Sequence, residues 1–102
     1  MTDPSRSAAA SPACVLVVDD QADVREALRM LLKVAGYAMA GADSPEQALA
    51  MLEQREFAAA LVDMNYRRDT TSGEEGLALI AQIAQRWPEL PVIAMTAWAS
   101  IE

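Results

Sequence analysis

The sequence contains no histidine and only one cysteine, and both scarcities exclude kinds of site. Cys14 has no second cysteine with which to form an intrachain disulfide, and without histidine a zinc site of the usual ligand types is not expected. No apolar run approaches the roughly 20 residues that a membrane span needs. Asp3 and Pro4 stand where a secretory signal would carry basic and then apolar residues. We therefore expect a cytoplasmic protein that makes no contact with a membrane.

Basic residues are also few. The 102 residues include 15 acidic and 8 basic side chains, which gives a net charge of −7. This balance argues against direct binding of nucleic acid by this segment and is compatible with a cation site. With 53% hydrophobic residues the chain can build one core, and hence one domain. Residues 1–13 are rich in Ser, Ala and Pro without periodicity, so we expect a flexible leader before a folded domain over 14–102.

The remaining sequence alternates between short continuous apolar runs and apolar residues spaced by three and four, which indicates alternating strands and helices. The expected strands cover residues 15–18, 37–42, 58–62 and 91–95. The expected helices run from about Gln21 to the stop at Gly36, from the cap Ser44 onward, and over 74–87. The last of these helices is expected to turn five side chains toward the core: Leu77, Ile80, Ile83, Ala84 and Trp87.

This order of elements predicts the fold class. Crossovers between consecutive parallel strands are short and right-handed, so strands and helices that alternate in this way form a parallel sheet with helices on both faces. We expect an α/β fold with a flavodoxin-like, doubly wound parallel sheet in the strand order 2-1-3-4. In such sheets the ligand site lies at the carboxyl ends of the strands, where the winding direction reverses.

Three of the apolar runs end in side chains that carry oxygen: Asp19 and Asp20, Asp63, and Thr96. In the order 2-1-3-4 the first and third strands are neighbours, so the three carboxylates come within reach of one cation. Without a cation they would repel one another strongly. Carboxylate oxygens with water and a backbone carbonyl suit Mg²⁺. Two alternatives stay open, because Asp19 or Asp20 could cap the following helix and Thr96 is a common strand residue.

Three stretches carry a resemblance to a known family: VLVVDDQADVREAL, ALVDMN and PVIAMTAWAS. Over about residues 14–102 the chain resembles the receiver domain of two-component response regulators. The segment DMN…RDTTSG…EG resembles in particular the receivers of AAA+ enhancer-binding transcription activators. The resemblance implies that Asp63 accepts a phosphoryl group from a sensor histidine kinase, while Asp19 and Asp20 hold Mg²⁺. An output domain that regulates transcription would lie outside this chain.

The resemblance also implies roles for three further residues. Asn65 would give Mg²⁺ its backbone carbonyl, and Thr96 would bind the phosphoryl oxygens. Asn65 and Trp98 stand at positions that tune how fast receivers lose the phosphoryl group. An amide at the first position could orient a water, and an indole at the second could shield the site.

One departure from the family pattern is large. Receivers have a fifth strand that ends in a lysine, followed by a fifth helix, whereas the only lysine here, Lys33, falls inside the first helix. We therefore expect a receiver that lacks the last strand–helix unit. Its strand over 91–95 would be an exposed edge, and apolar surface beside the first helix would be uncovered. Self-association through either surface is the expected compensation.

Two other functions compete with that of a phosphoacceptor. A pseudo-receiver would use the fold for dimerisation alone, without phosphotransfer. A phosphohydrolase with an aspartyl nucleophile would use the chemistry of Asp63 on a diffusible substrate. Such enzymes usually need an acidic residue two positions after the nucleophile, where this chain has Asn65. The sequence therefore favours a signalling module over an enzyme.

Overall fold

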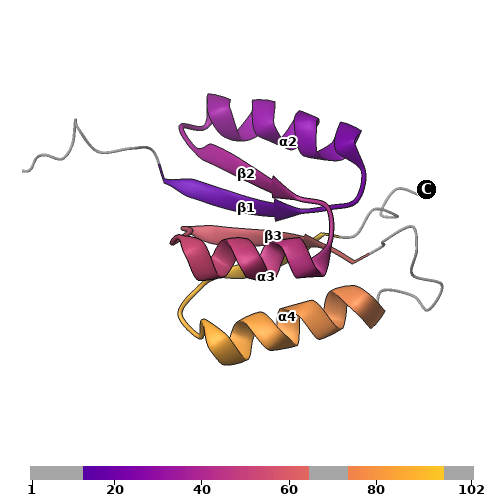
Figure 1. Cartoon of the computed structure of the whole chain (residues 1–102). Coiled ribbons are helices and arrows are strands. Elements are labelled where there is room, and N and C mark those ends of the chain that lie inside the picture. Colours follow the sequence, from indigo (N-terminus) through magenta and orange to yellow (C-terminus); the bar gives the residue numbers. More distant parts are fainter. Residues whose placement is uncertain (1–12, 65–73, 96–102) are drawn as a thin grey trace, which may run out of the picture.

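The computed structural model describes residues 13–64 and 74–95, which form four strands and three helices in alternation (Figure 1). Each predicted strand and helix is present, with ends within a few residues of the expected ones. No helix in the described ranges is long and apolar enough to cross a membrane. Along the chain the elements are β1 (Cys14–Val18), α2 (Ala22–Val34), β2 (Ala38–Ala42), α3 (Pro45–Gln54), β3 (Ala59–Asp63), α4 (Glu74–Arg86) and β4 (Val92–Met95).

The four strands form one parallel sheet in the order β2-β1-β3-β4. The predicted α/β fold and strand order are therefore confirmed. β1 lies between two neighbours, which explains why all five of its residues are buried and why its sequence is continuously apolar. Cys14 begins this strand as a buried thiol. The register places Val17 beside Gly41 of β2 and Leu61 of β3.

Local signals in the sequence set the ends of the first two helices. Gly36, with φ of 95°, ends α2 in a left-handed conformation that favours glycine. Ser44 begins α3 by accepting a hydrogen bond from the Gln47 amide at 3.2 Å, and the Gln47 side chain accepts one from the Asp43 amide. The alternative that Asp19 or Asp20 caps α2 is wrong. The N-cap residue is Gln21, which makes no side-chain capping hydrogen bond.

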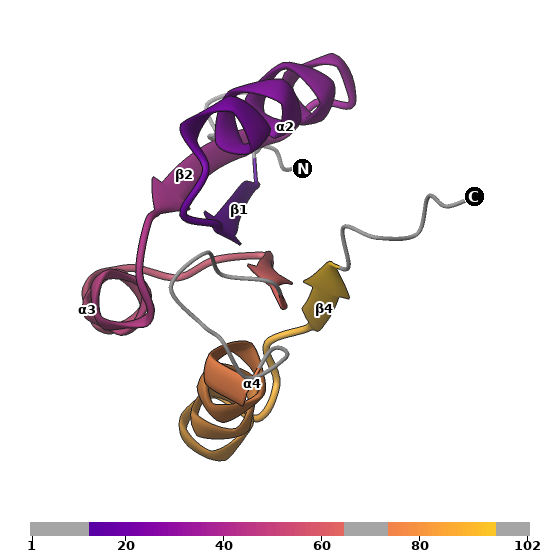
Figure 2. The ribbon, with the colours of Figure 1, turned by 90° about the vertical axis from the view of Figure 1, so that its right-hand side faces the viewer.

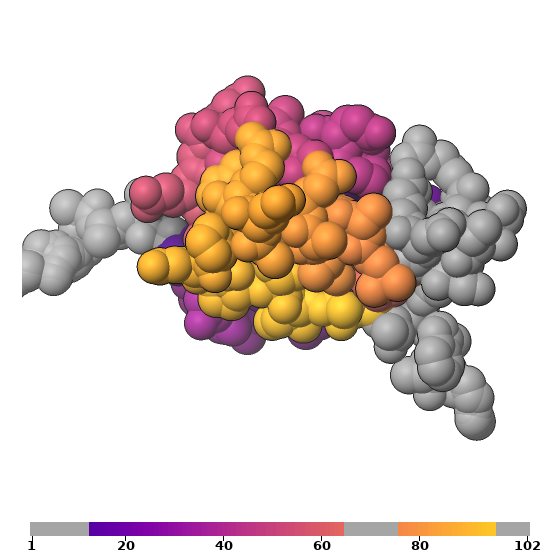
Figure 3. Space-filling view, turned by 90° about the horizontal axis from the view of Figure 1, so that it is seen from below, coloured from indigo at the N-terminus to yellow at the C-terminus, as the bar shows by residue number. Residues whose placement is uncertain are grey.

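Helices cover both faces of the sheet. α3 and α4 lie on one face and α2 lies on the other, where it contacts β1 and β2 (Figure 2). The main core is between the sheet and the α3/α4 layer, and the strands place every second residue in it. In Figure 3, α4 lies in the middle of the surface, between α3 and β4. The buried members of this core are Leu16, Val18, Ala42, Ala48, Leu52, Ala60, Val62, Leu79 and Ile83.

The predicted inward face of α4 is partly wrong. Ile83 is fully buried, and Ile80 and Trp87 pack against the core. Leu77 is 58% exposed and Ala84 is also exposed, whereas Leu79 is buried. The helix sequence is apolar on more than one side, so spacings of three and four fit two alternative stripes. The close approach of Gly76 to β3 selects the stripe that contains Leu79.

Several apolar side chains are exposed on the α2 side of the sheet. Leu31 and Val34 of α2 are 66% and 88% exposed, and Ile93 of β4 is 53% exposed. In the described part of the chain, α2 makes its sheet contacts with β1 and β2, while β3 and β4 carry no helix on that side (Figure 2). An apolar surface therefore extends from the flank of α2 to β4.

Candidate metal centre

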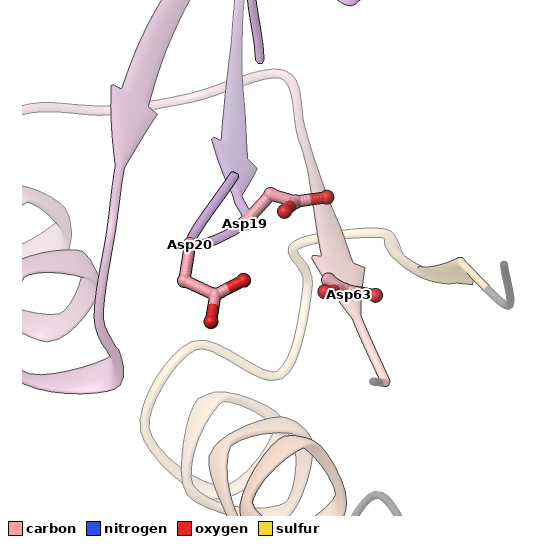
Figure 4. Close-up of side chains that lie close together, drawn as sticks. All are labelled: Asp19, Asp20 and Asp63. Atoms are coloured by element: carbon pink, nitrogen blue, oxygen red, sulfur yellow. The ribbon is translucent and has the colours of Figure 1, made fainter. Parts of the chain in front are cut away.

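Three aspartates meet at the carboxyl edge of the sheet, as the sequence predicts (Figure 4). Asp19 and Asp20 directly follow β1, and Asp63 is the last residue of the neighbouring strand β3. One carboxylate oxygen from each lies within 4.8 Å of the other two. Asp19 and Asp63 are each only 3% exposed. The parallel pairing of β1 with β3 therefore brings together carboxylates that are more than 40 residues apart in the sequence.

The main chain and its neighbours hold Asp19 in place. Its amide donates to the Ala42 carbonyl at 3.0 Å, and its Oδ1 accepts from the Gln21 amide at 2.8 Å. Its own carbonyl accepts a hydrogen bond from Arg25 Nη1 at 2.6 Å. The carboxyl group therefore has a fixed position beside Asp63.

The electrostatics of the site oppose the charged form of Asp19. Burial raises the pKa of this carboxyl above its ordinary value, and the negative charges of Asp63 and Asp20 raise it further. The hydrogen bond from the Gln21 amide and the charge of Arg25 lower the pKa and offset part of this rise. A divalent cation would remove the repulsion, and three carboxylates are the hard oxygen ligands that Mg²⁺ and Ca²⁺ take. The donor set of this site thus fits a divalent cation.

An open pocket of about 400 Å³ adjoins these residues. It runs from Asp19 and Asp63 along the flank of α2 to Met95 at the end of β4. A larger pocket, of about 650 Å³, lies at the opposite ends of the strands, beside the C-termini of α3 and α4. None of the three aspartates lines that pocket, so we assign the site to the smaller one.

Three of the predicted site residues lie outside the described ranges: Asn65, Thr96 and Trp98. Two contacts of the site were not foreseen from the sequence. Arg25 binds the main chain of Asp19, and Gly76 of α4 abuts the main chain of Asp63. A Cβ at Gly76 would lie 2.9 Å from the Asp63 carbonyl oxygen. The sequence held one signal for the contact between Arg25 and Asp19: Arg25 follows Asp19 closely and lies near the start of the next helix.

We expect Asp19→Asn to stabilise the metal-free protein near neutral pH. Carboxylates with oxygens within 4.8 Å of one another in a partly buried site repel by roughly a few kcal/mol, and after offsets by Arg25 and solvent we expect a gain on the order of 1 kcal/mol. Because the folded state has the raised pKa, the carboxylate destabilises the fold above that pKa and the effect disappears as the pH falls toward the ordinary value of about 3.9. The amide still accepts the Gln21 hydrogen bond.

Urea titrations of both proteins without metal, at several pH values, test this expectation. The difference in the free energy of unfolding should be largest near neutral pH and shrink on acidification. A difference that stays constant as the pH falls would contradict the assigned cause.

Gly76→Ala should destabilise the protein by about 1 to 3 kcal/mol, because the new Cβ meets backbone atoms of β3 and α4 must shift. In an open helical position the same change would stabilise by up to about 1 kcal/mol, so the expected sign is opposite to the ordinary one. Urea denaturation measures the effect. Gly36→Ala is the control, because it strains a residue in a left-handed conformation that has open space around it. Gly36→Ala should leave the Mg²⁺ affinity unchanged, whereas Gly76→Ala should lower the Mg²⁺ affinity.

Taken together, the fold and the site define a flavodoxin-like α/β protein with a cluster of three carboxylates, able to take a divalent cation, at the carboxyl edge of its sheet. The sequence matches the response regulator receiver domain family over residues 15–102. The chain belongs to this family.

The relatives include regulators of transcription. The chain is 36% identical over 88 residues both to the response regulator protein FleR of Pseudomonas aeruginosa and to the DNA-binding transcriptional regulator NtrC of Salmonella typhimurium. Each alignment covers 86% of this chain and 18% of the relative, so the chain spans less than a fifth of the length of these proteins. These relatives confirm the predicted resemblance to receivers of transcription activators.

A solved relative shows the same fold with a modified aspartate. A response regulator protein from Burkholderia pseudomallei, with a phosphorylated aspartic acid, a calcium ion and citrate, superposes with a TM-score of 0.73 at 29% identity. The superposition covers 87% of this chain and 49% of that one.

Proposed function

We propose that this chain is a phosphoacceptor and that Asp63 is the acceptor residue. The observation that carries the proposal is the gathering of three carboxylates from the ends of β1 and β3 within 4.8 Å, with Asp63 on the strand between β1 and β4. The phosphorylated aspartate and calcium ion in the Burkholderia relative support it. The domain would cover residues 14–102.

The chemistry follows from the placement of Asp63. One carboxylate oxygen attacks the phosphorus of a phosphohistidine on a sensor kinase. The phosphorus–nitrogen bond breaks, the histidine takes up a proton, and an acyl phosphate remains on Asp63. When Mg²⁺ is bound, it neutralises the negative charge that would otherwise keep the carboxylate and the phosphoryl group apart. Asp19, Asp20 and Asp63 would hold this ion.

The same proposal assigns roles to residues outside the described ranges. Asn65 would add its backbone carbonyl to the metal ligands, and Thr96 would donate a hydrogen bond to the phosphoryl oxygens. Asn65 and Trp98 would set the rate of hydrolysis. The partner that supplies the phosphoryl group would be a sensor histidine kinase, and the readout would be regulation of transcription by a separate output domain.

Dependence on the metal tests the function directly. The protein is incubated with a small acyl phosphate as phosphodonor, with Mg²⁺ or with a chelator in its place, and its intact mass is measured. We expect a gain of one phosphoryl group with Mg²⁺ and, with the chelator, a rate at least about a hundredfold lower, because a bound cation supplies several kcal/mol of charge stabilisation. No gain in the presence of Mg²⁺ would contradict the proposal for this chain.

A second candidate function rests on the exposed apolar surface formed by Leu31, Val34 and Ile93. We propose that a second copy of this chain covers it, through the flank of α2 or the edge of β4. In that case the chain could act as a dimerisation module without phosphotransfer. A monomeric sedimentation profile together with a cooperative melt at high temperature would contradict self-association, and the mass measurement above separates the two functions.

A further inference from the structure

We infer that Arg25 is a positioning residue for the metal centre: it fixes the main chain of Asp19, and Gly41 on the neighbouring strand leaves the space that its side chain needs. This inference rests on the proposed function, in which Asp19 binds a cation. The hydrogen bond of Arg25 goes to the main-chain carbonyl of Asp19 and not to its carboxylate. Its influence passes through Asp19.

The first argument is the hydrogen-bond geometry. Arg25 Nη1 donates to the Asp19 carbonyl oxygen at 2.6 Å, and this half-buried bond joins the second turn of α2 to the end of β1. On the other side of the same residue, the Asp19 amide donates to Ala42 of β2. With both peptide groups of Asp19 held, its carboxylate is directed to the pocket, where the Gln21 amide fixes one oxygen.

The second argument is the space above Gly41. A Cβ at this position would lie 3.1 Å from Arg25 Cδ and 3.4 Å from its Nε. Gly41 has no left-handed conformation that requires glycine. The close approach of the Arg25 side chain therefore explains why a glycine fits at this position. The stem of Arg25 crosses β2 here on its way to Asp19, and a side chain at 41 would occupy the same volume.

The third argument is charge. Three carboxylates gather at the site, and the Arg25 guanidinium is hydrogen-bonded to the main chain of one of these aspartates. The positive charge of the guanidinium beside Asp19 reduces the repulsion among the three carboxylates and so favours their close approach. Arg25 thus contributes both position and charge.

The chain offers a matched control one turn further along α2. Arg29 also donates to a backbone carbonyl, in this case that of Met39 in β2 at 3.2 Å, and it pairs with Glu26 at 3.5 Å. It joins the same helix to the neighbouring strand of the same sheet but makes no contact with Asp19 that the structure shows. Arg29→Met therefore removes an equivalent anchor while leaving the site intact.

The test compares Arg25→Met, Arg25→Lys and Arg29→Met in the full chain. Methionine keeps an apolar stem above Gly41 but neither donates nor carries charge, whereas lysine keeps both properties. Calorimetric titration with Mg²⁺ should show affinity lowered about 10-fold to 100-fold in Arg25→Met, the range seen when an outer-sphere partner of a metal ligand is lost. Arg25→Lys should recover part of this loss, and Arg29→Met should remain within about twofold of wild type.

A second readout requires no metal. Hydrogen exchange of the Gln21 amide, followed by NMR, reports whether the Asp19 carboxylate stays in place, and it should accelerate in Arg25→Met but not in Arg29→Met. Gly41→Val should reproduce the loss of Mg²⁺ affinity, and should add little in the Arg25→Met background if both act on one contact.

The outcomes separate the two hypotheses. Equal Mg²⁺ affinity and equal Gln21 exchange in Arg25→Met and wild type would overturn the inference. Equal losses in Arg25→Met and Arg29→Met would also overturn it, since they would reflect a loosened α2 alone. If wild type binds no Mg²⁺, the proposed function fails, while the exchange of Gln21 still decides whether Arg25 positions Asp19.

Discussion

Asp63→Asn is expected to abolish uptake of the phosphoryl group, with a rate at least about a thousandfold lower than that of wild type. The amide oxygen is a poor nucleophile and cannot form a stable acyl phosphate. The substitution also removes one of the three oxygens that would hold the cation, so Mg²⁺ affinity should fall as well. Asn is close to isosteric with Asp, and the removal of one of three repelling carboxylates should leave the fold intact. Intact mass after incubation with Mg²⁺ and a phosphodonor measures the effect.

Asp23→Asn is the matched control for this experiment. Asp23 lines the same pocket but lies exposed on the first turn of α2, outside the group of three carboxylates. It should take up the phosphoryl group at close to the wild-type rate. If Asp63→Asn still gains a phosphoryl group, a different residue is the acceptor and the assignment of Asp63 is wrong.

The second large effect is expected on stability. Leu79→Ala should lower the free energy of unfolding by about 2 to 5 kcal/mol, because it leaves a cavity where a leucine that is 1% exposed fills the space between α4 and the sheet. Native domains are stable by only about 5 to 15 kcal/mol, so this change alone brings the protein near its unfolding threshold. Thermal and urea denaturation measure the loss.

Leu77→Ala is the control, since it makes the same change two residues away in the same helix. Leu77 is 58% exposed, so its truncation should change the free energy of unfolding by less than about 1 kcal/mol. The pair also decides between the two possible inward stripes of α4. A larger loss for Leu77→Ala than for Leu79→Ala would restore the stripe expected from the sequence.

Much of the fold and the position of the site were predictable because their signals are local. The run VLVV can be buried on both faces only in a central strand, and the polar residues after it must then lie at the carboxyl edge. Asp63 follows the same rule on β3. Parallel crossovers leave few possible strand orders, and in the expected order 2-1-3-4 the first and third strands are neighbours, which brings the three aspartates together.

The features that escaped prediction depend on tertiary contacts. The inward stripe of α4 is selected by the approach of Gly76 to β3, which no periodicity within the helix reveals. The start of α2 was ambiguous because Asp19 accepts the Gln21 amide without occupying the capping position. Arg25 looked like an ordinary charged residue of an amphipathic helix until its contact with Asp19 was visible. In each case the deciding partner lies on a different element.

The central place of β1 in the sheet has a consequence for the order in which the chain can fold during synthesis. β1 leaves the ribosome before the other strands, yet one of its two neighbours is β3, and residues 19–58 must emerge before that neighbour is available. During this interval the apolar strand β1 has an open edge, and unpaired strand edges of folding intermediates are prone to aggregate. The slow step of folding should therefore be the docking of β3 onto β1, which makes β1 a central strand and brings Asp63 beside Asp19 and Asp20 at the same time.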